Sequence, residues 1–190
     1  MIEEVSIPGR DGRILCFFIS QENGEVKLCR YSSHENVDVF IPNTYLEMPI
    51  TSISEDCFFN HPEIKRIEFP DTLTIIGPQA FALCKGISEL VFPNKVTEIG
   101  HHAFRDCTGL RKVVMPPNLK RLETGLFSFC YLPDDVQIVL NEGLEVIESS
   151  IFSSGGVNLF FTLTIPNSVK YIATDAFEPG MNIISFHSGK

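Results

Sequence analysis

The residues of this chain that could bind a metal or act as nucleophiles are six cysteines and five histidines. Three of the cysteines recur at one interval, since Cys84, Cys107 and Cys130 stand 23 residues apart. A structural zinc site usually includes a close pair such as C-x-x-C, and the sequence has none. We therefore expect these three thiols to form a buried column, with neighbours about 5 Å apart as in adjacent strands. A buried thiol behaves as a small hydrophobe.

The other three cysteines leave alternatives open. Cys57 stands where the next two copies of the same segment have alanine, so we expect it to be packed as well. Cys16 and Cys29 would lie in diagonal positions on one face of a hairpin, and a disulfide between them is an alternative to two packed thiols. Pairing between cysteines of the column is a second, less favoured alternative.

The histidines favour no catalytic or metal-binding role. His101 and His102 fall in a turn, where the preceding copy has Pro78 and Gln79. His34, His61 and His187 are scattered and form no H-E-x-x-H motif. The sequence also lacks a glycine-rich phosphate loop and a G-x-S-x-G nucleophile elbow. We therefore predict a protein that is not an enzyme and that uses neither cofactor nor metal.

The residues that would position the cysteines belong to a repeated segment. Residues 73–93 read LTIIGPQAFALCKGISELVFP, and residues 96–116 read VTEIGHHAFRDCTGLRKVVMP. A fixed period in the range of about 20–50 residues indicates stacked structural units rather than a conventional globule. We expect six units of 23–25 residues that start at residues 50, 73, 96, 119, 144 and 169.

Each unit contains two candidate strands and one compact turn. Residues 110–115 end in the alternation of a half-buried strand, and Pro116 stops its ladder because proline has no N–H to donate. Residues 96–99 form a second extended piece before a glycine turn. The apolar spacing within residues 103–110 predicts a short helical or 3₁₀ turn that directs a phenylalanine inward.

Stacked copies would align these phenylalanines into an aromatic spine. No single unit can bury its apolar face alone, so each neighbour completes the core of the next. The expected spine consists of Phe58, Phe81, Phe104, Phe127, Phe152 and Phe177.

The repeated unit resembles the BspA-type class of leucine-rich repeats, whose consensus runs roughly V-T-x-I-G-x-x-A-F-x-x-C-x-x-L-x-x-V-x-I-P. The fourth and fifth units depart from it, because Asn141 replaces the proline and residues 153–156 read SSGG where a cysteine is expected. The resemblance covers nearly the whole chain. It implies a right-handed, curved solenoid of the leucine-rich type that binds proteins, often at a microbial cell surface, and it implies no catalytic activity.

Residues 1–49 lie outside the repeat and are expected to cap the stack. Residues 14–20 and 25–31 are strand-like runs, and Asn23-Gly24 between them is the strongest short hairpin signal. Residues 37–41 resemble the strand half of a unit, followed by a longer loop to Ile50. A terminal unit must shield the open end of a solenoid, so we expect residues 1–190 to form one domain with a β-hairpin cap.

The composition and charge of the chain argue against a nucleic-acid partner and bear on its compartment. The formal net charge is −9, whereas a nucleic-acid surface should be basic. Residues 1–5 lack the basic start of a secretory signal, and no segment is long enough to cross a membrane. We expect either an intracellular protein or a fragment of an exported one. The resemblance favours the second, whereas the initial methionine and thiols that look free favour the first.

The outward face of the main sheet supplies the candidate binding residues. One expected row alternates in charge, through Asp38, Arg66, Glu89 and Lys112, which favours a self-satisfied ladder that fixes the register. The adjacent row is more apolar and runs through Phe40, Glu68, Val91, Val114 and Val139. Exposed apolar patches often mark partner sites, although valine also suits a strand that faces water.

We therefore predict a non-enzymatic protein-binding module of the surface or secreted adhesion type, whose partner is a host or matrix protein if the chain is exported. An intracellular leucine-rich-repeat scaffold or regulator is the alternative. The candidate binding residues are Phe40, Glu68, Val91, Lys112, Val114 and Val139.

Overall fold

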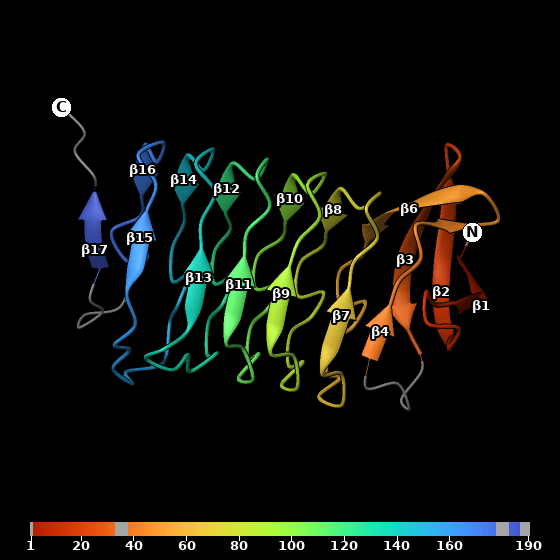
Figure 1. The fold of residues 1–190 in the computed structure, drawn as a ribbon, viewed down its shortest axis with the longest axis horizontal. Coiled ribbons are helices and arrows are strands. Elements are labelled where there is room, and N and C mark those ends of the chain that lie inside the picture. Colours follow the sequence, from red (N-terminus) through yellow and green to blue (C-terminus); the bar gives the residue numbers. More distant parts are fainter. Residues whose placement is uncertain (1, 33–37, 178–182, 187–190) are drawn as a thin grey trace.

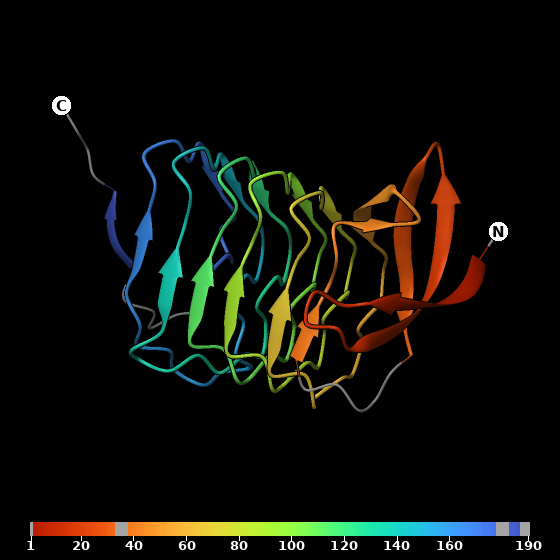
Figure 2. The ribbon, with the colours of Figure 1, turned by 45° about the vertical axis from the view of Figure 1, so that its right-hand side comes forward.

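The computed structural model describes residues 2–32, 38–177 and 183–186. Over these residues the chain forms a β-solenoid of about six turns with an N-terminal β-hairpin. Figure 1 shows two rows of short strands that run along the stack, and Figure 2 shows the N-terminal strands at one end of it. The histidines at positions 34 and 187 lie outside the described residues.

The two rows contain most of the strands. The front row consists of β4 (Asp38–Phe40), β7 (Arg66–Glu68), β9 (Glu89–Val91), β11 (Lys112–Val114), β13 (Gln137–Val139), β15 (Leu163–Ile165) and β17 (Ile183–Phe186). The back row consists of β6 (Met48–Ile53), β8 (Ile75–Ile76), β10 (Glu98–Ile99), β12 (Arg121–Leu122), β14 (Val146–Ile147) and β16 (Tyr171–Ile172).

Each row places one apolar side chain per turn in the core. In the front row Leu90 and Val113 are fully buried at the centres of β9 and β11, which pair in parallel register. In the back row Ile76 and Ile99 are buried and directly paired. The strands are short because each turn of the solenoid needs only one inward residue from each side.

The segments expected to be helical or 3₁₀ form successive tight turns instead, and the described residues contain no helix. In the third unit His102 and Asp106 have positive φ angles of 56° and 58°, which a right-handed helix does not allow. The N–H of Phe104 donates to the carbonyl of Leu126 in the next turn at 3.1 Å, rather than to a carbonyl four residues earlier. The prediction of helical turns was wrong because alternate N–H groups of these turns bond to the next unit.

The predicted aromatic spine forms one stack through the core. The rings of Phe58 and Phe81 lie 4.7 Å apart, those of Phe81 and Phe104 lie 5.3 Å apart, and each pair is within 12° of parallel. Phe127, Phe152 and Phe177 continue the stack at intervals of 5.9, 5.7 and 6.3 Å. The first five rings are buried, and the sixth is partly buried at the C-terminal end.

The N-terminal strands extend the back row. β1 (Ile2–Pro8), β2 (Ile14–Glu22) and β3 (Glu25–Tyr31) pair antiparallel, and β3 pairs in parallel with β6. The predicted hairpin turn is confirmed, since Asn23 and Gly24 have φ angles of 52° and 77°. The ring of Tyr31 stacks on Phe58 at 4.9 Å, so the cap continues the aromatic spine.

Two features of the cap were not expected from the sequence. β1 forms an additional edge strand beside β2. The segment that was expected to be a loop before Ile50 contains β5 (Thr44–Tyr45), which pairs with the start of β6 around Leu46 and Glu47. These two residues have positive φ angles of 48° and 66°, and neither is a residue type that signals such a turn.

Candidate protein-binding face

The front row places the candidate binding residues in the expected register. Phe40 pairs with Glu68 across β4 and β7. Val114 of β11 pairs with both Val91 of β9 and Val139 of β13. The three valines therefore form one continuous stripe, which we call the valine stripe.

The valine stripe faces outward. Val91 is 51% exposed and Val139 is 54% exposed, whereas the central Val114 is half-buried between them. The central residues of β4, β7, β9 and β11, such as Val113, point into the core. An exposed apolar row on a regular sheet is a feature of protein interaction sites, although single exposed apolar residues are common.

Charged side chains flank the valine stripe and pair with one another. Lys112 Nζ lies 2.5 Å from Glu89 on the adjacent strand. Arg66 donates to Glu68 of the same strand at 2.6 Å, and its guanidinium lies 5.2 Å from the ring centre of Phe40. Each exposed pair contributes about 0.2–1 kcal/mol. The Lys112–Glu89 pair joins two strands and helps to fix their register, whereas Arg66 pairs within its own strand and Asp38 pairs with Arg13, so the expected ladder of alternating charge forms only at Glu89 and Lys112.

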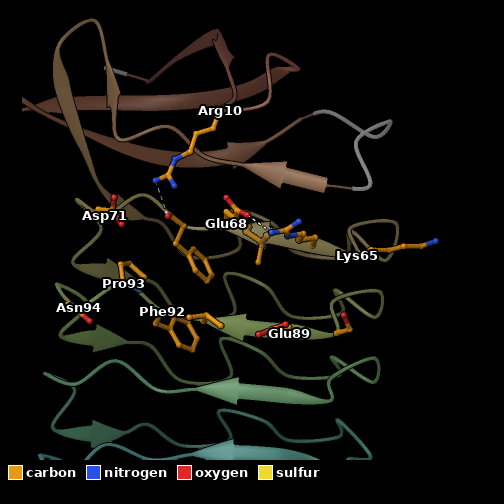
Figure 3. A pocket seen from close by; sticks show the side chains of 13 residues that line it. Arg10, Lys65, Glu68, Asp71, Glu89, Phe92, Pro93 and Asn94 are labelled. Atoms are coloured by element: carbon orange, nitrogen blue, oxygen red, sulfur yellow. Dashed lines mark hydrogen bonds and ion pairs between the residues drawn. The ribbon is translucent and has the colours of Figure 1, made fainter.

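A pocket of about 570 Å³, the β7/β9 pocket, lies beside the valine stripe at the first of two interruptions of the front row; the second lies between β13 and β15. β4 and β7 form one sheet and β9, β11 and β13 form another, so no ladder joins β7 to β9. Figure 3 shows the pocket, with Glu68, Glu89, Phe92 and Pro93 among the labelled residues. Arg66 and Phe69 line it as well. The regular repeat gave no signal of this interruption, and sequence reasoning missed the pocket.

The N-terminal cap contributes one side chain to the β7/β9 pocket. Arg10 Nη2 donates to the side-chain oxygen of Asn43 at 2.8 Å and to the carbonyl of Phe69 at 3.3 Å. The same Asn43 oxygen accepts the backbone N–H of Asp71 at 2.8 Å. This network fastens the cap to the first unit, and it also commits the Arg10 guanidinium to structural contacts.

The cysteine column is buried, and each of its thiols forms the same hydrogen bond. Cys84 Sγ lies 3.0 Å from the carbonyl of Phe58, and Cys107 Sγ lies 3.2 Å from that of Phe81. Cys130 repeats the contact to Phe104 at 3.1 Å. Burial raises the pKa of the Cys84 thiol to about 12 and raises the pKa values of the Cys107 and Cys130 thiols as well.

A histidine occupies the column position of the first unit. His61 stands three residues after Phe58, as Cys84 does after Phe81, and it is 5% exposed. Its Nδ1 lies 2.7 Å from Glu63, and its ring meets that of Tyr31 edge-on at 5.0 Å. Alignment of the unit at residue 50 with the next one would have revealed this substitution, which the sequence interpretation treated as a scattered histidine.

The remaining thiols are free. The register of the β2–β3 pair shifts between Phe18 and Ile19, next to Cys29. Cys16 lies opposite Ser32, whose N–H donates to the Cys16 carbonyl at 3.0 Å. Cys16 and Cys29 are partly exposed and Cys57 is buried, and none of the three is in a disulfide.

The histidine pair lies in a turn of the third unit. His101 is exposed and His102 is partly buried, and burial lowers the pKa of His102, as does His101 beside it. The described residues contain no cluster of three or more histidine, cysteine or acidic side chains that could hold a metal ion. They also contain no helix long and apolar enough to cross a membrane.

Comparison with sequence families gives one match. The model of the BspA type leucine-rich repeat region matches residues 51–184 in six copies. A search of the curated proteins finds no match.

Solved structures support the same architecture. The leucine-rich repeat protein TpLRR of T. pallidum superposes with a TM-score of 0.71 and 21% identity, over 82% of this chain and 78% of that chain. A leucine rich cell surface protein of Faecalibacterium prausnitzii A2-165 gives a TM-score of 0.60 and 21% identity, over 95% of this chain and 55% of that chain. The chain thus spans about half the length of the second protein, and at these identities the likeness shows the fold.

Proposed function

Because the chain belongs to the BspA-type leucine-rich repeat family, we propose that it is a non-enzymatic protein-binding module that uses the front row of strands. The observation that carries the proposal is the valine stripe, in which Val91 and Val139 leave about half of their surface in water. A β-branched row in parallel register presents a rigid apolar surface, and the charged pairs beside it limit its contacts to one orientation.

The proposal is tested by a single substitution at the centre of the stripe. Val114→Lys places a positive charge between Val91 and Val139. Because the flexible lysine side chain can extend into water, the variant should still fold. We expect the variant to retain a wild-type melting temperature and to lose at least about tenfold in affinity for the partner, which corresponds to ~1.4 kcal/mol. Unchanged affinity in the folded variant would remove the valine stripe from the binding site.

A matched control separates the stripe from the rest of the surface. Val146 is a partly buried valine of the back-row strand β14, and Val146→Lys makes the same chemical change on the opposite side of the solenoid. We expect Val146→Lys to bind the partner as wild type does. The readout is the fraction of a surface-exposed or matrix protein retained by each immobilised variant, followed by a titration with the purified partner.

We propose further that the module acts at the cell surface or after secretion, as an adhesion or interaction module. Support comes from the family and from the F. prausnitzii relative, which is described as a cell surface protein. The test is fractionation of the native protein, with protease added to intact cells. Degradation on intact cells supports a surface position, whereas protection until lysis contradicts it.

The alternative proposal is an intracellular scaffold or regulator that uses the same front row. The free thiols of Cys16 and Cys29 favour it, because partly exposed thiols persist best in a reducing compartment. The same fractionation separates the two proposals.

A further inference from the structure

The β7/β9 pocket lies where two expected rungs of the front-row ladder are missing. At the next step of the stack, the N–H of Arg111 bonds the carbonyl of Ser88, and the N–H of Phe92 bonds the carbonyl of Val114. Among the described residues, no backbone donor makes the equivalent bonds to the carbonyls of Lys65 and Val91, and the facing N–H groups of Ser88 and Phe69 are likewise unbonded.

The side chains around the interruption bring two carboxylates to the pocket from opposite walls. Glu68 comes from β7 and Glu89 from β9, and both line the pocket. Each makes an ion pair, with Arg66 and Lys112 respectively, at the exposed surface. A carboxylate has about four acceptor positions, so each retains capacity for a second donor.

The cations that line the pocket are less available to a ligand. Arg66 lies over Phe40 and is paired with Glu68, and Arg10 is committed to Asn43 and the carbonyl of Phe69. Figure 3 shows the Lys65 side chain directed away from the other labelled residues. The uncommitted groups are therefore mainly acceptors, and Val91 and Pro93 add apolar surface beside them.

We infer that the β7/β9 pocket accepts a lysine or arginine side chain from a partner segment whose apolar residues lie on the valine stripe. This inference rests on the proposed function and specifies its partner as a basic, apolar segment. The ammonium or guanidinium group bonds the carbonyls of Lys65 and Val91 and the carboxylates of Glu68 and Glu89, and the aliphatic stem lies on Val91. The net charge of −9 attracts such a segment at long range.

The experiment uses three immobilised synthetic peptides of equal length, which alternate valine with arginine, with glutamine or with glutamate. The full chain is titrated onto each peptide at low and at high salt. We expect the valine–arginine peptide to bind most tightly and to weaken with salt. The double variant Glu68→Gln, Glu89→Gln should weaken that binding by about tenfold.

A control double variant has the same net charge as Glu68→Gln, Glu89→Gln. Glu98→Gln, Glu123→Gln removes two carboxylates on the back-row side of the stack, and it should leave binding of the valine–arginine peptide unchanged. If the two double variants lost the same affinity for the valine–arginine peptide, the effect would be long-range attraction alone, and the inference of a cation pocket would be wrong. Failure of the valine–arginine peptide to bind, or equal binding of the glutamate peptide, would overturn it as well.

The remaining outcomes separate this inference from the proposed function. If the glutamine peptide binds as tightly as the arginine peptide and Val114→Lys abolishes both, the valine stripe stands and the cation pocket is wrong. If the Glu68→Gln, Glu89→Gln pair weakens binding but Val91→Thr, Val139→Thr does not, the pocket stands and the stripe is not the binding surface. Threonine nearly matches valine in shape, so the second pair should keep the strands intact.

Discussion

Phe104 lies between the rings of Phe81 and Phe127, which it stacks on at angles of 5° and 21°. Its ring centre is 5.3 Å from that of Phe81 and 5.9 Å from that of Phe127, and it has no exposed surface. We expect Phe104→Ala to lower the free energy of unfolding by about 3–5 kcal/mol, because it removes a buried aromatic ring and leaves a cavity. Urea denaturation followed by circular dichroism measures the change.

The control for Phe104 is a phenylalanine that the solenoid leaves in water. Phe160 is 56% exposed, and Phe160→Ala should change the free energy of unfolding by less than about 0.5 kcal/mol. Similar costs at the two positions would contradict the assignment of Phe104 to a continuous spine.

The cysteines differ in access, and this difference can be measured with a thiol reagent. Cys84, Cys107 and Cys130 are buried, their pKa values are raised, and each donates to a backbone carbonyl. At mildly alkaline pH these thiols stay protonated in the native state and should react only on unfolding, because the thiolate is the nucleophile. Cys16 and Cys29 are partly exposed and should react first.

Native thiol titration should therefore proceed in two phases. The fast phase is expected to disappear in the double variant Cys16→Ser, Cys29→Ser, whereas denatured wild type should expose all six thiols. A column cysteine that reacts in the fast phase would mean that the turns open locally on the timescale of labelling.

At the scale of the elements, the sequence predicts the structure correctly where a residue has the same structural role in every unit. The inward phenylalanines, the strand before each proline and the Asn23-Gly24 hairpin could all be predicted, because each depends on local chemistry repeated at a fixed interval. The turns around Ala103 could not, because alternate N–H groups in them bond to the next unit and the αL positions are occupied by residues such as His102 and Asp106.

The candidate binding face also has one part that the sequence predicts and one that it does not. The register of Val91, Val114 and Val139 follows from the period, and the structure places them as expected. The β7/β9 pocket does not follow from it, because the units on either side have nearly the same sequence pattern. Ladders are also interrupted between β10 and β12 and between β13 and β15, so the positions of the interruptions do not follow the repeat period.

Two glycines that follow back-row strands, Gly77 and Gly100, allow the backbones of adjacent units to approach. A Cβ added at Gly100 would lie 2.4 Å from the backbone nitrogen of Pro78, which no side-chain movement can relieve. We expect Gly100→Ala to lower the free energy of unfolding by about 1–3 kcal/mol, as overpacking does, or more if the back row separates. The measurement is again urea denaturation.

Gly143→Ala provides the comparison for Gly100→Ala. Its added Cβ would meet the Asn141 side chain and the Pro117 carbonyl at 3.2 Å, so a small shift accommodates it. A change of less than about 0.5 kcal/mol is expected at this position. If Gly100→Ala were equally mild, the close approach of the units at Pro78 would not be required for stacking.

At the scale of the whole molecule, the cap and the repeats share one core rather than meeting at a separate interface. Phe17, Tyr31 and Phe58 are mutually in contact, with ring centres 4.9–5.7 Å apart, so the spine passes from the cap into the first unit without a gap. In a solenoid each unit is stabilised mainly by its neighbours. We therefore propose that the cap and the first units gain and lose their structure together.

Hydrogen exchange on the intact chain tests this coupling. Tyr31→Ala removes a ring that contacts both Phe17 and Phe58, and it should speed exchange in β2 and β3 and also in the turns around Phe58 and Phe81. The effect should decline along the stack, because stabilisation passes only between nearest neighbours. Faster exchange confined to β2 and β3 would instead show that the cap is an independent unit, and the first repeat would then have to shield its own end of the spine.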